Sequence, residues 1–400
     1  MRLLNRWFPF DVSPTQGALI GVLTMAEFSR TALIVTLLPA FVQGPLGSSL
    51  SLAGLATSAH YLLDTAGRSP AGWLVDRIGP RVTLMIGVAI EILALVLAMH
   101  THRPLGLVAF LALMGVGTAS HWPAVVTGTN RLTPNQYRGA MMGAVFAGWL
   151  TGSGLGPVAI NFVIGNQLTD RFAFEVLIWA DVAAFLLAVL LNGPRLRELA
   201  RDARPHRAAR GWAALWPLRA VLPGMFVQTM VLGLLMPVLQ PLTHDVLHLS
   251  QWEFAALLLG AGALTVLLLV PMGRLADHMG LKAPLSGGFW LAAASLLGLA
   301  FIRSFWALVG VGSLLGLSYA LILPAWNAFL ARMIPAEQEG LLWGVFMTVE
   351  GIGLTVGPSV GARLFEIAPE APFLLAAAIL FVMGFFYWAY HPGARARAIL

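Results

Sequence analysis

"GWLVDRIGPR", residues 72–81, returns 201 residues later as "GRLADHMGLK", residues 273–282. Within the decapeptides, this offset aligns Gly72 with Gly273, Asp76 with Asp277 and Gly79 with Gly280. Beyond them, without any gap, it aligns Pro123 with Pro324, Arg131 with Arg332, Gly152 with Gly353, Gly156 with Gly357 and Pro157 with Pro358. Self-similarity at a fixed offset is the mark of a duplicated structural unit. The sequence therefore predicts two halves of the same topology.

The composition indicates that both halves are built from membrane-spanning helices. Of the 400 residues, 58% are hydrophobic and 10% are charged, whereas about 25% are charged in a typical soluble domain. Apolar runs of about 18–25 residues, the length that crosses a bilayer as a helix, recur along the chain. They predict twelve spans, at roughly 17–41, 50–73, 82–99, 104–128, 139–163, 173–192, 218–243, 251–272, 284–301, 305–330, 340–365 and 370–390.

The basic residues are distributed as the positive-inside rule requires of a membrane protein. Most of the 24 Lys and Arg residues lie in the two terminal tails and in the loops that follow even-numbered spans. This bias predicts that both termini are cytoplasmic. It also accounts for the net charge of +6 without nucleic acid as a partner. The densest run, "RLRELARDARPHRAAR" (195–210), joins spans 6 and 7.

We therefore expect an N-terminal six-helix half (1–192), a basic cytoplasmic linker (193–217) and a C-terminal six-helix half (218–400). The fold class is all-α. The chain has no cysteine, which excludes disulfides and thiolate metal sites. No nucleotide-binding motif and no nucleophile–base array stands out, so the sequence predicts neither an enzyme nor a cofactor or metal.

Comparing the halves separates scaffold residues from residues that occur only once. The N-terminal half alone carries Glu27, Arg30 and Asp64, where the C-terminal half has Gln228, Val231 and Thr265. A charge near mid-membrane costs about 2.5–3.5 kcal/mol on insertion scales, so such residues normally face protein or a water-filled cavity.

Glu27 and Arg30 are three residues apart, so they share a helix face and can pair. A pair that merely orients span 1 is the plainer interpretation; we favour a functional one. Asp64 is a candidate proton site, because burial favours its neutral form whereas a nearby arginine favours its charged form.

Other polar and aromatic residues within the spans carry less specific signals. Trp122 and Trp149 are predicted deeper than interfacial anchors, and either stack on a ligand or simply pack. The three lone acidic residues are interpreted as structural (Glu91, Asp181) or as a contribution to the C-terminal half of a cavity (Glu350). His60 and His121 are expected to make ordinary polar contacts.

The repeated decapeptide resembles motif A of the major facilitator superfamily, G-x-L-x-D-R-x-G-R-K between spans 2 and 3. Gly72, Leu74, Asp76, Arg77, Gly79 and Arg81 match, while Pro80 departs from the pattern. The resemblance implies a secondary carrier that works by alternating access, with its site between the halves near mid-membrane. It assigns a gating role to Gly72, Asp76, Arg77, Gly79, Arg81 and, in the second copy, Asp277.

Two groups of that superfamily compete as the more specific resemblance. "LALMGVGTA" (111–119) keeps Gly115, Gly117 and Ala119 of the drug-antiporter motif R-x-x-Q-G-x-G-x-A but lacks its arginine and glutamine. The flippases that move the glycolipid anchor of lipoteichoic acid are more similar. They have a Glu-x-x-Arg pair in span 1, an Asp in span 2 and a Trp in span 4, where this chain has Glu27, Arg30, Asp64 and Trp122.

The resulting prediction is a proton-coupled flippase of an amphiphilic glycolipid in the bacterial cytoplasmic membrane, acting as a monomer. Glu27, Arg30, Asp64, Trp122 and Trp149 are predicted to bind substrate, and Asp64, with Glu27 and Arg30, to couple protons. A drug or small-metabolite/proton antiporter is the second hypothesis, and a structural or receptor protein is a distant third.

Overall fold

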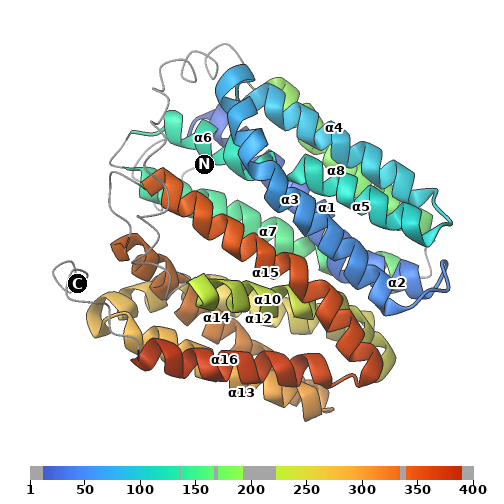
Figure 1. The fold of residues 1–400 in the computed structure, drawn as a ribbon, viewed down its shortest axis with the longest axis vertical. Helices are drawn as coiled ribbons and strands as arrows, with labels where there is room; N and C mark the ends of the chain where they lie inside the picture. Colours follow the sequence, from blue (N-terminus) through green and yellow to red (C-terminus); the bar gives the residue numbers. More distant parts are fainter. Residues whose placement is uncertain (1–11, 135–136, 166–169, 192–221, 334–338, 390–400) are drawn as a thin grey trace. The chain divides into compact units, whose positions relative to one another are not determined.

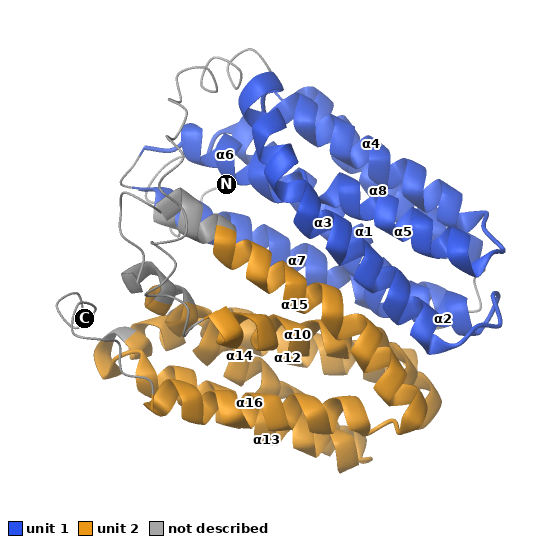
Figure 2. Cartoon of the chain, viewed as in Figure 1, with its two compact units in different colours: residues 1–205 blue, residues 206–400 orange. Residues whose placement is uncertain are grey.

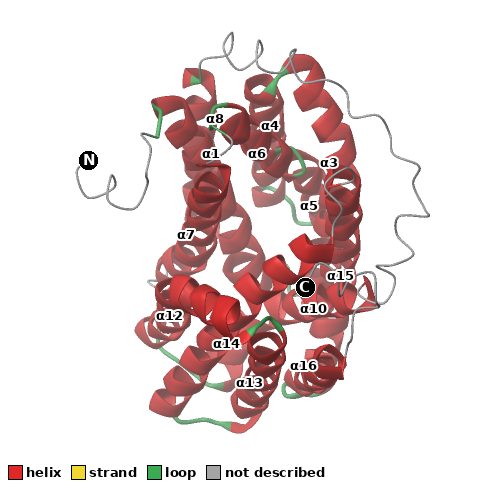
Figure 3. Cartoon of the chain, turned by 90° about the vertical axis from the view of Figure 1, so that its left-hand side faces the viewer, coloured by secondary structure: helices red, strands yellow, loops and turns green. Residues whose placement is uncertain are grey.

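The computed structural model describes residues 12–134, 137–165, 170–191, 222–333 and 339–389. This part of the chain is helical, with short loops and no strand (Figure 3). Contacts divide the chain into two compact units, 1–205 and 206–400 (Figure 2). The linker predicted at 193–217 lies outside the described residues.

Unit 1 consists of long helices that lie side by side (Figure 1). In chain order they are α1 (Pro14–Ala32), the π-helical turn η2 (Leu33–Leu37), α2 (Leu38–Gln43), α3 (Leu50–Ile78), α4 (Pro80–Met99), α5 (Pro104–Thr118), α6 (His121–Arg131), α7 (Arg138–Gly165) and α8 (Asp170–Leu190). The start of α1 is specified locally, because Ser13 and Gln16 form a reciprocal capping box that satisfies free backbone donors.

Unit 2 repeats this arrangement. Its elements are α10 (Leu222–Leu235), the 3₁₀ turn η6 (Met236–Val238), α11 (Leu239–Pro241), the π-helical turn η7 (Leu242–Val246), α12 (Gln251–Met279), α13 (Lys282–Phe301), α14 (Phe305–Met333), α15 (Glu339–Ile367) and α16 (Ala371–Ala389). Corresponding helices pack on corresponding partners: α1 on α7 as α10 on α15, and α3 on α5 as α12 on α14. The duplication is therefore present in the packing as well as in the sequence.

The twelve predicted spans are present in the described part of the chain. Eleven helical segments are long and apolar enough to cross a membrane, and α3 is the twelfth. It falls short in hydropathy because His60, Asp64 and Arg68 lie on it. The chain is therefore an all-α, multi-pass membrane protein.

Two helix boundaries differ from the sequence prediction. Span 2 was expected to end near residue 73, but α3 continues to Ile78, so most of the decapeptide is helical. The turn itself comes at Gly79, with φ 89° and ψ 161°, and Gly280 repeats it with φ 78° and ψ 164°. This backbone region is essentially restricted to glycine. The two glycines are therefore required by the turn, whereas Gly72 has open space around it.

Span 4 was expected to be one helix and is broken between α5 and α6. Pro123 has no N–H with which to bond the carbonyl four residues earlier. The equivalent Pro324 nonetheless leaves α14 continuous, so proline alone does not explain the break. The N-terminal half adds Ser120, whose hydroxyl donates to the Gly117 carbonyl at 2.9 Å. Such a local bond competes with regular helix hydrogen bonding.

Close helix packing in each unit depends on glycine stripes. On α7, a Cβ added at Gly148, Gly152 or Gly156 would collide with α1. On α15, a Cβ added at Gly353, Gly357 or Gly361 would collide with α10. Small residues let membrane helices approach closely, which is the role of the glycines of "GSGLGP" (152–157) and "GIGLTVGP" (351–358).

Candidate functional site

Glu27 and Arg30 form an ion pair on α1. Arg30 donates to Glu27 Oε2 through Nε at 3.1 Å and through a terminal nitrogen at 2.5 Å. Their side chains are only 10% and 11% exposed. The predicted i,i+3 pairing is therefore present in unit 1.

The glycine stripe of α7 brings a second helix to this pair. Gly152 lies against the α1 backbone and the Glu27 side chain, and the adjacent Ser153 hydroxyl donates to Glu27 Oε2 at 3.5 Å. A larger residue at Gly152 would push α7 away and remove this contact. The glycine therefore contributes to the site through the geometry it permits.

Asp64 on α3 has a different partner from the one that the sequence suggested. Arg68, one turn further along α3, donates to Asp64 Oδ2 at 2.7 Å. Thr118 at the end of α5 donates to Asp64 Oδ1 at 3.4 Å. The Asp64 side chain is 5% exposed and that of Arg68 is 27% exposed. Arg68, and not Arg30, is thus the direct counter-ion of Asp64.

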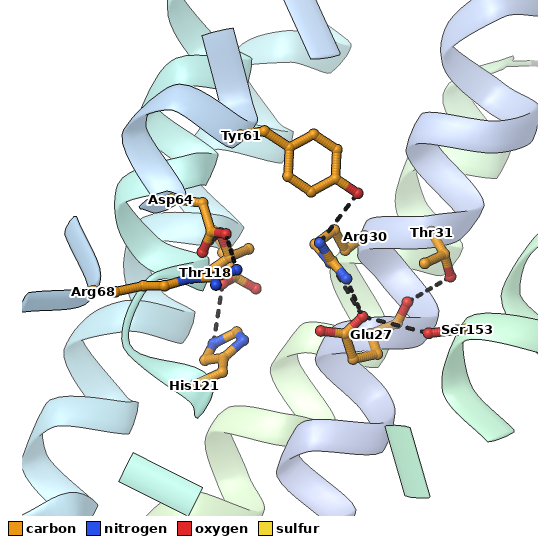
Figure 4. Close-up of polar contacts among 10 residues, drawn as sticks. Glu27, Arg30, Thr31, Tyr61, Asp64, Arg68, Thr118, His121 and Ser153 are labelled. Atoms are coloured by element: carbon orange, nitrogen blue, oxygen red, sulfur yellow. Dashed lines mark hydrogen bonds and ion pairs between the residues drawn. The ribbon is translucent and has the colours of Figure 1, made fainter. Parts of the chain in front are cut away.

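Tyr61 links the two ion pairs. It lies on α3, three residues before Asp64, and Arg30 donates to its hydroxyl at 3.3 Å. Figure 4 shows the arrangement, with Glu27, Arg30 and Ser153 on one side and Asp64, Arg68 and Thr118 on the other. The result is a buried polar cluster in which two carboxylates are matched by two guanidinium groups.

Sequence reasoning missed several members of this cluster. Arg68 and Tyr61 have a signal, since spacings of four and three residues place them on the same helix face as Asp64. Ser153 and Thr118 have none, because they reach the site from other helices.

The equivalent places in unit 2 offer much less polarity. Val231 is 3% exposed, and Thr265 is 7% exposed with its hydroxyl donating to the carbonyls of Ala261 and Gly316. Gln228 is partly buried. Glu350, also partly buried, is an acidic residue well inside α15. At these equivalent positions, unit 1 is therefore polar and unit 2 is mainly apolar.

Trp122 and Trp149 are half-buried and pack against the hydrophobic core of unit 1. Phe146 lies between them, with its ring centroid 5.2 Å from that of Trp122 and 6.4 Å from that of Trp149. Both tryptophans thus make packing contacts and retain an exposed portion.

The motif A residues make contacts within unit 1. Arg131 at the end of α6 pairs with Asp76 at 3.1 Å, Arg77 lies 4.2 Å from the centre of the Trp73 ring, and Arg81 donates to the Val189 carbonyl at 2.7 Å. The last contact places a cation at the C-terminus of α8, where the helix dipole favours it. The side chain of Asp277 lies outside the described part of the chain.

Glu91, interpreted as structural, and His121, expected to make an ordinary polar contact, are in contact with each other. Glu91 is fully buried on α4, and its Oε1 lies 3.0 Å from His121 Nε2. The contact lacks the geometry of a hydrogen bond. Asp181 on α8 is also fully buried. His60 packs edge-on against Tyr61, with the ring centroids 5.1 Å apart.

The cluster can offer hydrogen bonds and charge to a ligand, but its composition does not suit a metal. In the described ranges, no group of three His, Asp or Glu side chains is placed to hold a metal ion. Arginines already occupy the carboxylates of both ion pairs. Guanidinium and carboxylate groups that are close together and partly accessible can exchange internal bonds for bonds to a polar headgroup or a proton.

Comparison with known proteins identifies the family. Residues 19–222 and 221–398 each match the sequence profile of the Major Facilitator Superfamily. The chain belongs to this superfamily of membrane transporters. The two matches correspond to its two halves.

Its relatives include proteins named proton-coupled antiporter flippase LtaA. The one from Staphylococcus saprophyticus is 25% identical over 377 residues, covering 92% of this chain and 92% of the relative. The one from Staphylococcus aureus strain N315 is 24% identical over 385 residues, covering 94% and 95%.

Solved structures of other transporters share the fold. The nucleoside transporter NupG superposes with a TM-score of 0.75 at 13% identity, covering 94% of this chain and all of that one. A POT family transporter in complex with a thioalcohol-conjugated peptide gives 0.75 at 12% identity, covering 92% and 94%.

The buried Glu27–Arg30 pair predicts a specific pattern of stability. Arg30→Leu leaves Glu27 buried without its counter-ion and is expected to cost about 3–5 kcal/mol, whereas Glu27→Gln combined with Arg30→Leu should recover most of that loss. Reversible unfolding of the purified protein by a denaturing detergent measures both changes.

Arg363→Leu is the matched control. Arg363 pairs with Glu366 at the same i,i+3 spacing, but its side chain is 72% exposed, so its loss should cost about 0–1 kcal/mol. If Arg30→Leu proves as mild as this control, the pair is not held in a buried environment.

Proposed function

We propose that the protein is a proton-coupled flippase, a secondary carrier that moves an amphiphilic glycolipid across the bacterial cytoplasmic membrane by alternating access. Membership of the superfamily and the names of its LtaA relatives support this proposal. The observation that carries it is the paired polar cluster of unit 1, set against neutral residues at the equivalent places of unit 2. On this proposal the protein is a carrier and not an enzyme, acts as a monomer and has no nucleic-acid partner.

The imbalance between the halves suits an amphiphile. A headgroup can hydrogen-bond to Glu27, Arg30 and Asp64, while its tails lie along apolar helices or stay in the lipid. Hydrogen bonds to charged groups contribute about 1.5–3 kcal/mol, enough to select a headgroup when tails bind indiscriminately. Trp122 and Trp149 add flat apolar faces against which a sugar ring can lie.

Proton coupling is assigned to Asp64. In its charged form Asp64 holds Arg68 at 2.7 Å; a proton on Asp64 cancels that attraction and releases the guanidinium. Arg30 on α1 is held by Glu27 and donates to Tyr61 on α3. A change at Asp64, on the same helix as Tyr61, therefore acts on Arg30. Proton binding and headgroup binding therefore compete for one set of partners, which is what an antiporter requires.

Motif A supplies the gate in this proposal. Asp76 is 68% exposed, and exposed ion pairs are worth about 0–1 kcal/mol. The Asp76–Arg131 contact is thus weak enough to break and re-form during a transport cycle. Gly72, Arg77, Gly79, Arg81 and Asp277 complete the proposed gating set.

The second candidate is a drug or small-metabolite/proton antiporter. The glycines that the chain shares with the drug-antiporter motif favour it. They also have a packing explanation, because a Cβ on Gly115 or Gly117 would collide with α3 or α4 respectively. The shared glycines therefore discriminate poorly between the two functions.

The orientation proposal places both termini and the 193–217 linker in the cytoplasm, as the charge bias favours. A cysteine introduced at Ala208 is a clean probe, because the chain has no cysteine of its own. It should react with a membrane-impermeant reagent only after the cells are opened. Reaction in intact cells would reverse the orientation.

The substrate is tested by reconstitution. Purified protein in vesicles should translocate a fluorescent glycolipid and discriminate it from a phospholipid with the same tails. Arg30→Ala or Trp122→Ala should reduce that discrimination about tenfold or more, because one strong headgroup contact is lost. Tail-length preference should stay unchanged.

Arg363→Ala and Trp306→Ala serve as controls, since both side chains are exposed in unit 2. Transport of a water-soluble dye, with glycolipids left in their original leaflet, would reject the flippase and favour the drug antiporter.

Coupling is tested by Asp64→Asn. The amide keeps the shape of the side chain but cannot gain or lose a proton, so the variant should fold and lose its response to an imposed pH gradient. Flipping measured with and without the gradient gives the readout. Asp245→Asn, at an exposed site, should keep the full response. Asp64 is not the coupling site if its variant behaves in the same way.

A further inference from the structure

A second group of ionisable residues lies buried in unit 1, apart from the polar cluster. Glu91 on α4 and Asp181 on α8 are 0% exposed, and His121 on α6 is 3% exposed. His121 Nε2 lies 3.0 Å from Glu91 Oε1. Helices α4 and α8, which carry Glu91 and Asp181, pack against each other. None of these three residues is used by the mechanism proposed above.

Glycines of α5 place this group beside the polar cluster but on another side of that helix. A Cβ on Gly117 would lie 2.8 Å from Glu91 Cγ, whereas one on Gly115 would collide with the α3 backbone between His60 and Asp64. Helix α5 therefore separates Glu91 from Asp64. Thr118 donates to Asp64 and lies three residues before His121. The segment 118–121 therefore contacts both the polar cluster and the second group.

The two carboxyl groups lack the donors that a carboxylate needs. In the part of the chain that the structure describes, neither Glu91 nor Asp181 forms an ion pair with a Lys or Arg side chain or accepts a hydrogen bond with proper geometry. Ser29 adjoins Asp181, but its hydroxyl donates to the Leu177 carbonyl at 3.0 Å. The Ser29 hydroxyl hydrogen is therefore directed at Leu177 and not at Asp181.

The surrounding charges do not replace these donors. The buried acidic residues and histidines on the helices packed against α4 are His60 and Asp64 on α3, His121 on α6 and Asp181 on α8. Helix α5 has no titratable residue. Arg30 is already paired with Glu27. An isolated carboxylate in so buried a place is costly enough that the group takes up a proton instead.

We propose that Glu91, His121 and Asp181 form a second proton-binding site within unit 1. One proton, carried by Glu91 Oε1 beside a neutral His121, makes the Glu91–His121 pair neutral. A second proton makes Asp181 neutral. Both protons come from water, and no other bond forms or breaks. The site goes beyond the coupling role of Asp64 and does not depend on which substrate is carried.

Infrared spectroscopy of the purified protein in lipid nanodiscs tests the site without any transport assay. At neutral pH the wild type should show a carbonyl band of protonated carboxyl groups that shifts in D₂O. Glu91→Gln and Asp181→Asn should each reduce this band, because each removes one protonated group. The exposed variant Asp245→Asn should leave it intact. Absence of the band from the wild type, or no reduction in the two variants relative to Asp245→Asn, would overturn the proposal.

The choice of substitutions guards against misfolding. Gln and Asn imitate the neutral acids, so both variants should unfold at the wild-type temperature if the native groups are protonated. His121→Gln should leave both contributions to the band in place, because the two protons are carried by the carboxyl groups of Glu91 and Asp181.

Sodium ions test whether the site binds a metal cation instead of a proton. The wild-type unfolding temperature should not differ between sodium chloride and choline chloride at equal ionic strength. A stabilisation specific to sodium, absent from Glu91→Gln, would assign the site to a metal cation and reject the proton.

Discussion

A charged side chain inside a membrane span has to find its partner within the protein, because the hydrocarbon supplies none. Unit 1 satisfies this requirement at two places. Glu27 and Arg30 neutralise each other on α1, and Asp64 and Arg68 do so on α3. Both pairs are intrahelical, so their formation needs no particular tertiary structure. What tertiary packing adds is their proximity, through the Tyr61 hydroxyl that reaches Arg30 from α3.

The glycines make that proximity possible. Gly152 allows α7 to lie against α1 at Glu27, and Gly115 allows α5 to lie against α3 next to Asp64. The neighbouring hydroxyls, Ser153 and Thr118, then reach the two carboxylates. These glycines, which have no side chain, thereby determine which polar side chains of neighbouring helices meet. Substituting them would change the site without touching its chemistry.

Helix α3 joins the polar cluster to the repeated decapeptide of residues 72–81. Tyr61, Asp64 and Arg68 lie on its buried part, and Asp76 lies near its end, where it contacts Arg131. The helix is continuous from Leu50 to Ile78 although Pro70 lies within it. A movement of α3 as a whole would therefore also act on the Asp76–Arg131 contact. Because that contact is exposed and weak, little energy opposes its release.

The sequence by itself determined the membrane class, the duplication and the i,i+3 pairing of Glu27 with Arg30, because each depends on composition or on spacing along one helix. The same spacing rule, applied to Asp64, also points to Arg68. Only the tertiary structure decided that Ser153, Thr118 and Tyr61 join the cluster, and that Glu91 meets His121. These residues lie on different helices, and the meeting of their side chains depends on packing distances that no single-helix period encodes. The break in span 4 belongs to the same category, since α5 ends at Thr118 and α6 begins at His121, while the equivalent α14 is continuous through Pro324.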